Sequence, residues 1–364
     1  VKSSVRTDLG NIQLGTLNIL RSRQQRLQRM QIDSSAQPRS EARASDVAWK
    51  RLHGDVFRAP SYPFVLACLL GAGSQLFFMV YISLVGFVVF FTASTYRPHV
   101  SFVALVLTAV FGFVNGFVSM RVLKFFGVTD MAFAAATAAF CLPFFVYSGL
   151  ITEHVLLFVF GAYSESTVIA KIAYTLLWCI SNGLTCFVGA YYGYVLPQVK
   201  PPSPVSKVAR KVPPQPFYLR LIVVLPVFGG LQYLAVCAEI MYVMRSFWRA
   251  HIYSMFGFLL LDFVLLLLVV ALLSCIQTYL QLSAGNFAWW WRSFLVGAAG
   301  GFYVAVGLLR ILLEEMDASY VESDLVYFVY VYLIAGAYAA VAGTVSTVAS
   351  YIFVESLYSN IRVD

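Results

Sequence analysis

Two acidic residues, Glu239 and Asp262, lie deep inside long apolar runs of the sequence. An ionised side chain inside the hydrocarbon of a membrane is costly, so such residues usually face a cavity or a partner. Three other ionisable residues lie nearer the ends of their runs, where a side chain can reach water by snorkelling: Lys171, Arg310 and Glu355. Glu239 and Asp262 are therefore the candidate intramembrane polar site. The alternative is a structural pair, with Arg245 or Gln232 as a partner.

The sequence carries no pattern typical of a soluble enzyme. It has no P-loop, no HExxH motif and no GxSxG motif. Its six cysteines all fall inside apolar runs and none is in a CxxC pair, which is typical of small buried hydrophobes. We therefore expect no enzyme activity, no catalytic residue, no metal site and no cofactor.

The composition is that of a membrane protein. Apolar residues make up 60% of the chain and charged residues only 12%, against about 25% charged in ordinary soluble domains. About 20 apolar residues span the hydrocarbon core of a bilayer. The sequence predicts an all-α, polytopic membrane protein in residues 61–364, after a basic segment over residues 1–60. Eight spans are expected, at about 63–92, 100–121, 131–152, 166–195, 219–245, 251–281, 292–313 and 325–358.

A proline-rich segment, Leu196 to Arg220, divides these spans into two sets of four. We call it the strap. It holds seven of the thirteen prolines, five basic residues and no acid. Proline removes backbone donors and blocks helix formation, so the strap is expected outside the hydrocarbon, as a semi-extended loop over 196–218.

The charges of the loops predict the orientation. When residues 1–60 are placed in the cytosol and the spans alternate, 20 of the 25 Lys and Arg residues lie on the cytosolic side and four on the other, with Lys171 inside a span. Positive loops favour the cytosol. We therefore expect residue 1 and the tail 359–364 to be cytosolic. Because topology accounts for the basic charge, no nucleic-acid partner is implied.

Within residues 1–60, the stretch 14–31 has the pattern of a basic amphipathic helix. Contact with an anionic membrane surface is one interpretation, and a solvated helix leading out of an upstream element is the favoured one. Residues 33–45 have the composition of a flexible linker. The chain starts at Val1 without a signal peptide, which is expected of a fragment or a processed product.

Two aromatic and basic motifs flank the spans. Trp49 to Pro60, WKRLHGDVFRAP, precedes the first span, and Trp289 to Arg292, WWWR, precedes the seventh. Both are typical of anchors at the headgroup level. Gly54 and Asp55 also predict a specific turn, which an anchor does not require.

Glycines at GxxxG spacing occur in three spans, and this spacing lets helix backbones approach closely. Packing within the bundle is the favoured interpretation, and docking of other proteins' helices is the alternative. The candidate helix-docking residues are Gly112, Gly116, Gly189, Gly193, Gly297 and Gly301.

The chain resembles the nonaspanins, the transmembrane nine superfamily of endomembrane proteins. The matching pieces cover nearly the whole chain in the family's order: WKRLHGDVFRAP at 49–60, GAGSQ at 71–75, GFVSMR at 116–121, GAYYG at 189–193, the strap's VPPQPFY at 212–218, Glu239, SFW at 246–248, WRSF at 291–294, and the C-terminal stretch from GT at 343–344 to IRVD at 361–364.

The resemblance implies nine spans after a lumenal domain, so this chain would begin just after the first span. It also implies a Golgi or endosomal protein that helps to sort other membrane proteins, including cargo with glycine-rich spans. The family tail ends Lys-x-Asp or Lys-x-Glu and engages the COPI coat. The matching positions here are Arg362 and Asp364. The planar guanidinium of Arg362 stands where the family has the compact ammonium of lysine.

Two functions therefore follow from the sequence. The first is a sorting factor that binds lipid-embedded segments of cargo membrane proteins. The second is a secondary transporter or ion pathway that uses Glu239 and Asp262. A third, weaker possibility is a scaffold whose upstream lumenal domain does the binding.

Overall fold

The computed structural model describes residues 52–90, 100–128, 130–160, 165–206, 208–248, 252–315 and 321–359. In these ranges every regular element is a helix. The long helices are α2 (Pro63–Phe90), α3 (Val100–Phe125), α4 (Met131–Val159), α5 (Glu165–Val195), α6 (Leu221–Trp248), α7 (Ile252–Ser283), α9 (Gly300–Glu315) and α10 (Val321–Ser359), and the short ones are η3 (Phe217–Leu219) and α8 (Trp290–Ala298).

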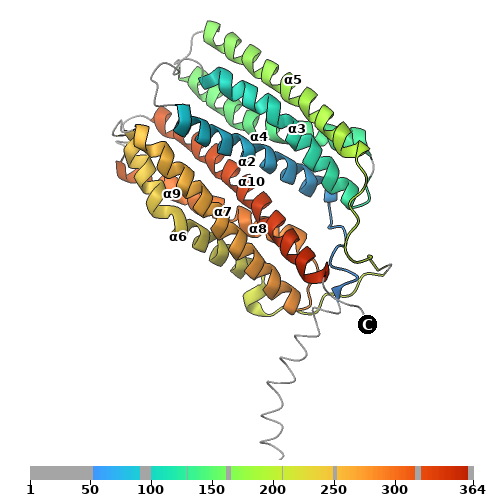
Figure 1. Ribbon diagram of the computed structural model, residues 1–364. Coiled ribbons are helices and arrows are strands. Elements are labelled where there is room, and N and C mark those ends of the chain that lie inside the picture. Colours follow the sequence, from blue (N-terminus) through green and yellow to red (C-terminus); the bar gives the residue numbers. More distant parts are fainter. Residues whose placement is uncertain are drawn as a thin grey trace, which may run out of the picture.

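Seven stretches in the described part are long and apolar enough to cross a membrane: Pro63–Val88, Val106–Phe125, Ala132–Val159, Leu221–Ala238, Gly257–Ser283, Trp290–Leu312 and Asp324–Ser359. The prediction of an all-α polytopic membrane protein is confirmed. The remaining long helix, α5, carries more polar side chains and packs along α3 at the outer edge of the bundle (Figure 1). The seventh predicted span is two helices, α8 and α9, with a break at Ala299.

Helices α2 and α10 lie side by side in the middle of the bundle (Figure 1). Helices α3, α4 and α5 lie beyond α2, whereas α6, α7 and α9 lie beyond α10. The contact is close because Gly73 of α2 leaves room for the side chain of Thr344 and the carbonyl oxygen of Ala340. A Cβ at Gly73 would overlap both atoms. The strap therefore separates two packed sets of helices that meet along α2 and α10.

The GxxxG glycines lie at contacts inside the chain. Gly116 of α3 lies against the backbone of Cys186 in α5, and Gly189 of α5 lies against the carbonyl oxygen of Phe113 in α3. The other four also face neighbouring helices of the same chain: Gly112 and Gly193 between α3 and α5, and Gly297 and Gly301 against α10. Internal packing therefore occupies these faces, as the favoured interpretation has it.

A buried polar network holds the first set of helices together. The amide nitrogen of Gln75 donates to Asn182 Oδ1 at 2.7 Å, and that of Asn115 donates to Gln75 Oε1 at 3.1 Å. Ser119 Oγ donates to the carbonyl oxygen of Ala67 at 3.1 Å. These side chains come from α2, α3 and α5 and are fully or almost fully buried. Buried polar groups cost free energy unless they are hydrogen-bonded, so the network specifies how these helices pack.

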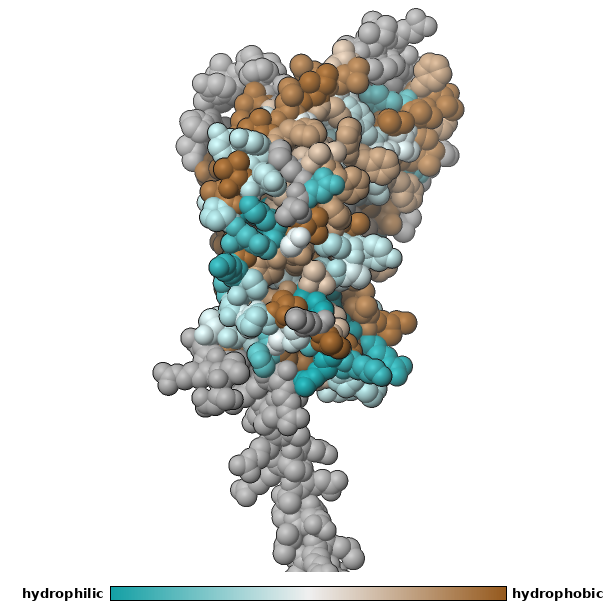
Figure 2. Space-filling model, turned by 90° about the vertical axis from the view of Figure 1, so that its right-hand side faces the viewer, coloured by the Kyte–Doolittle hydropathy of each residue, from teal (hydrophilic) through white to brown (hydrophobic). Residues whose placement is uncertain are grey.

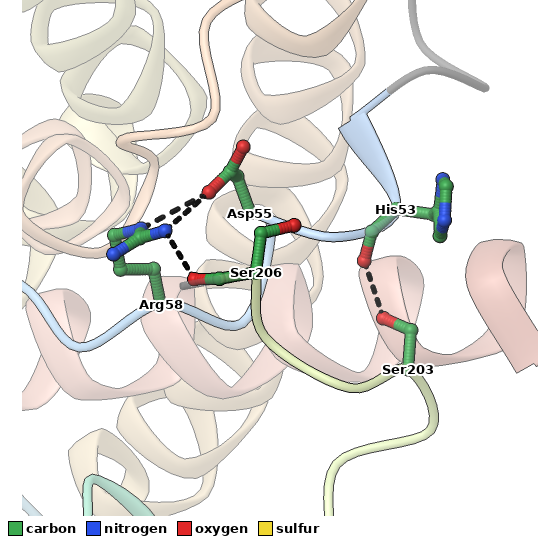
Figure 3. A network of polar contacts seen from close by, with 5 residues as sticks. All are labelled: His53, Asp55, Arg58, Ser203 and Ser206. Atoms are coloured by element: carbon green, nitrogen blue, oxygen red, sulfur yellow. Dashed lines mark hydrogen bonds and ion pairs between the residues drawn. The ribbon is translucent and has the colours of Figure 1, made fainter. Parts of the chain in front are cut away.

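The turn predicted at Gly54 and Asp55 is present, since the Asp55 N–H donates to the carbonyl oxygen of Leu52 at 2.9 Å. Figure 3 shows how the turn holds the strap. Arg58 pairs with Asp55 at 2.6 Å and donates to the carbonyl oxygen of Ser206 at 2.8 Å. The Ser206 N–H donates to the carbonyl oxygen of Gly54 at 2.7 Å. The turn therefore ties the strap to the start of α2.

The anchor interpretation of the two aromatic motifs is wrong for Phe57, Trp289 and Trp290, which are buried inside the protein. Trp289 is fully buried, and its indole N–H donates to the carbonyl oxygen of Val56 at 2.9 Å. Trp290 stacks on Trp289 at 4.0 Å, and Phe57 packs edge-on against Tyr358 of α10. We call residues 52–58, 203–206 and 289–290 the clasp. Packing of these aromatic rings buries a large apolar area, which stabilises the clasp.

In the part that the structure describes, the strap has no regular secondary structure before the short helix η3. At its start, Lys124 Nζ donates to the carbonyl oxygens of Tyr194 and Leu196 at 2.5 and 2.6 Å. Arg121 donates to the carbonyl oxygen of Pro197 at 2.6 Å. These cations satisfy carbonyl groups left without partners at the end of α5. In Figure 2, hydrophilic residues gather mainly in the lower part of the face shown, towards the strap.

The packing of α3 on α5 makes a testable prediction. Gly189→Val places a side chain on the backbone of Phe113, so we expect the free energy of unfolding to fall by about 1–3 kcal/mol. Gly183→Val, on the same helix, is the matched control because no atom of another element lies within 4 Å of its added Cβ. Thermal unfolding in detergent measures both variants. Equal melting temperatures for the two would contradict the observed packing.

Candidate functional site

The candidate site is a cavity of about 360 Å³ at the junction of the two helix sets. Its walls come from α2, α6, α7, α9 and α10. Asp262 lines it from α7 and is 8% exposed. Ile334 of α10 also lines it and is 45% exposed, so the cavity reaches the lipid-facing surface of the bundle.

The cavity is almost entirely apolar. Aliphatic and aromatic side chains form most of its wall, among them Leu84 of α2, Val236 of α6 and Leu308 of α9. Among the lining residues that the structure describes, Asp262 is the ionisable acid and Tyr338 of α10 carries the hydroxyl group. A site of this kind suits an apolar body that carries one polar or charged group.

The Tyr338 hydroxyl and the Gln232 side chain both lie close to Gly300. A Cβ built on Gly300, at the break between α8 and α9, would lie 2.8 Å from the Tyr338 hydroxyl oxygen and 2.7 Å from Gln232 Oε1. Gln232 is fully buried and donates its amide to the carbonyl oxygen of Val296 at 2.8 Å. The absence of a side chain at Gly300 therefore leaves space for these two polar groups near the helix break.

The structure thus places one of the two predicted acids in a cavity. Glu239 belongs to α6, but its side chain lies outside the described residues, as do those of Lys171 and Arg245. A pairing between Glu239 and Asp262 stays a prediction. The tail residues Arg362 and Asp364, the stretch 14–31 and Trp49 also lie outside the described residues.

Sequence reasoning did not find Tyr338. A tyrosine in an apolar run is common, and only the packing of α7 on α10 brings it to Asp262. A signal did exist for Gln232, since an amide in the middle of a membrane span needs a buried partner. In the described part of the chain, no group of three His, Cys, Asp or Glu side chains is arranged to hold a metal ion. Asp262 and Tyr338 give the site a carboxyl group and a hydroxyl group that can bind by charge and hydrogen bonds.

A bundle of membrane-spanning helices with a lateral, mostly apolar cavity defines a polytopic membrane protein with a site open to the lipid. Residues 12–319 match the family described as Endomembrane protein 70. The chain belongs to this family.

The curated relatives of this chain are named as members of the transmembrane 9 superfamily, the family that the sequence resembles. The chain is 29% identical to human transmembrane 9 superfamily member 4 over 322 residues, covering 87% of this chain and 49% of that protein. It is 29% identical to Arabidopsis thaliana member 9 over 325 residues, covering 88% of this chain and 50% of that protein. For rat member 2 the identity is 28% over 320 residues, covering 88% and 48%. The resemblance to the transmembrane nine superfamily is confirmed.

The chain spans about half the length of these curated relatives. No solved structure matches it.

The site predicts unequal effects for two polar residues. Asp262→Asn keeps the shape of a side chain at the cavity wall, so we expect it to lower the melting temperature less than Asn115→Leu does. Asn115→Leu breaks the buried network with Gln75 and should lower the free energy of unfolding by about 1–3 kcal/mol. Thermal unfolding in detergent checks both. A lower melting temperature for Asp262→Asn than for Asn115→Leu would mean that Asp262 is structural.

Proposed function

We propose that this endomembrane multi-span protein helps to sort and localise other membrane proteins by binding their membrane-spanning segments. The observation that carries the proposal is the lateral cavity, which opens towards lipid beside Ile334 and contains the buried acid Asp262. A segment that lies in the same bilayer reaches such an opening without leaving the membrane. The glycine-rich faces are filled by the chain's own helices, so we assign cargo binding to the cavity.

The cavity supports binding better than transport. A pathway for an ion or a polar solute needs polar groups or water along its length, because hydrocarbon does not solvate charge. In the part of the wall that the structure describes, Asp262 and Tyr338 are the polar side chains and the other lining residues are apolar. Transport through Asp262, together with Glu239, is the second candidate, and the buried acid is the observation that favours it.

We place the protein in the Golgi or endosome, with the strap and the C-terminal tail in the cytosol. The distribution of Lys and Arg supports this orientation. In this proposal Arg362 and Asp364 engage the COPI coat, which would return the protein and its cargo to the Golgi. The first 60 residues, which are strongly basic, would lie on the same cytosolic side.

The test uses cells that lack the protein. They are rescued with the full-length protein as wild type, as Asp262→Asn, or as the control Glu355→Gln, which removes a charge from α10 away from the cavity. Membrane proteins of the surface and the Golgi are then quantified by mass spectrometry. We expect a selected group of membrane proteins to be lost without the protein. Wild type and Glu355→Gln should restore this group, and Asp262→Asn should not.

Two outcomes oppose the proposal. An unchanged membrane proteome, with a lumenal pH or metal content that only the wild type restores, would favour transport. Full rescue of the selected group by Asp262→Asn would separate sorting from the cavity. The amount and location of each variant are measured in the same cells, so that loss of the protein is not read as loss of function.

A further inference from the structure

Helices α7 and α10 line the cavity with matching stripes of side chains. The lining residues of α7 are Leu259, Asp262, Phe263 and Leu266, which lie on one face of a helix because their spacing is i, i+3, i+4 and i+7. Those of α10 run from Ile334 to Val341 at the same spacing. Helix α10 also packs on α2 and α9, which form much of the remaining wall (Figure 1). The cavity is therefore elongated along the helices.

The length of the cavity matches part of a lipid chain. On α7 and on α10 alike, the first and last lining residues are seven positions apart, which corresponds to about 10 Å at about 1.5 Å per residue. One leaflet contributes about 15 Å to a hydrocarbon core of about 30 Å. Lipid chains and membrane-spanning helices both run across the bilayer. A cavity of this length and direction therefore accommodates a large part of one hydrocarbon chain.

The wall suits hydrocarbon better than a lipid headgroup. Of the described lining residues, eleven are apolar and none is basic, so a phosphate group would find no cation to pair with there. Cavities lined by aliphatic and aromatic side chains stay dry and take up apolar molecules. The volume of about 360 Å³ lies within the range of small-molecule sites, about 300–1,000 Å³.

Lipid reaches the cavity from the side. Ile334 at the mouth is 45% exposed, whereas Val304 and Leu308 of α9, on the inner wall, are 4% and 2% exposed. A lipid chain beside Ile334 enters without leaving an apolar environment, so its entry requires no transfer through water. In an empty cavity the inner wall would lack the dispersion contacts that close-packed interiors make. The lipid that surrounds the bundle is therefore the occupant that access and packing both favour.

We propose that the cavity holds one hydrocarbon chain of a membrane phospholipid, with the headgroup outside the mouth. The inference goes beyond the proposed function, because a partner helix is about 10–12 Å across and stays at the mouth. The bound chain would then form part of the surface that a partner contacts beside Ile334. Binding of lipid and binding of a partner are separate properties of this region.

The experiment uses the full-length protein in phosphatidylcholine nanodiscs. Part of the lipid is a phosphatidylcholine with a photo-activatable diazirine in one acyl chain, and peptide mass spectrometry locates the adducts after irradiation. We expect adducts at Val304 and Leu308, which a chain reaches only from inside the cavity. Their yield should exceed the yield at Leu123 by at least about tenfold, because Leu123 is fully buried in close packing and does not line the cavity.

Filling the cavity should remove these adducts. Val80→Trp places a large ring at the wall formed by α2, and it should lower the yield at Leu308 to that at a buried site outside the cavity. The yield at Leu261, which is 67% exposed to bulk lipid, should stay unchanged. Val88→Trp is the matched control on the same helix, since Val88 is 40% exposed and does not line the cavity. Ala337→Phe fills the same space from α10 and serves as the second variant if Val80→Trp does not fold.

Three outcomes would overturn the inference. The first is a wild-type protein without adducts at Val304 and Leu308, which would leave the proposed sorting function untouched, since rescue of the membrane proteome tests that function separately. The second is labelling of these residues by a photo-activatable sterol and not by the phospholipid probe. The third is labelling that persists in the folded variants Val80→Trp and Ala337→Phe. A phosphatidylcholine with the diazirine in its headgroup should give no adducts at Leu308, and adducts there would contradict a headgroup outside the mouth.

Discussion

The buried contact between Trp289 and the turn at Val56 determines how the two helix sets meet. The indole N–H of Trp289 donates to the Val56 carbonyl oxygen, and the fully buried ring brings the start of α8 against the chain entering α2. The strap is fixed to the same turn through Ser206 and Arg58. The turn before α2, the strap and the start of α8 are far apart in the sequence but contact one another at one end of the bundle.

The packing between α2 and α10 differs between the end of the bundle near the clasp and the opposite end. Near Gly73 and Thr344 the backbones approach closely. Further from the strap, Leu84 of α2 and Tyr338 of α10 line the cavity together with Asp262 of α7. The bundle is closely packed at one end and contains the cavity towards the other. The cavity is therefore open to the lipid while the interior of each helix set stays covered.

The sequence predicted the fold class because membrane spans are read from composition and length alone. It also predicted that Asp262 is buried and that Gly54 and Asp55 form a turn. It did not predict that Phe57, Trp289 and Trp290 are buried, because an interfacial belt and a buried cluster share one composition. The cavity depends on which faces of α7, α9 and α10 meet. Helices α7 and α10 are apolar on all sides, so their sequences do not indicate which face packs inward.

The central claim is that membrane partners bind at the mouth of the cavity. The most direct test places a photo-activatable amino acid at Ile334, beside the cavity, or at Leu184, a more exposed apolar position on α5. Full-length protein carrying either residue is irradiated in cells, and covalent adducts with other membrane proteins are identified by mass spectrometry. The account predicts specific adducts at Ile334 and none at Leu184. Adducts at Leu184 alone would contradict it and would move the binding surface to the face formed by α3 and α5.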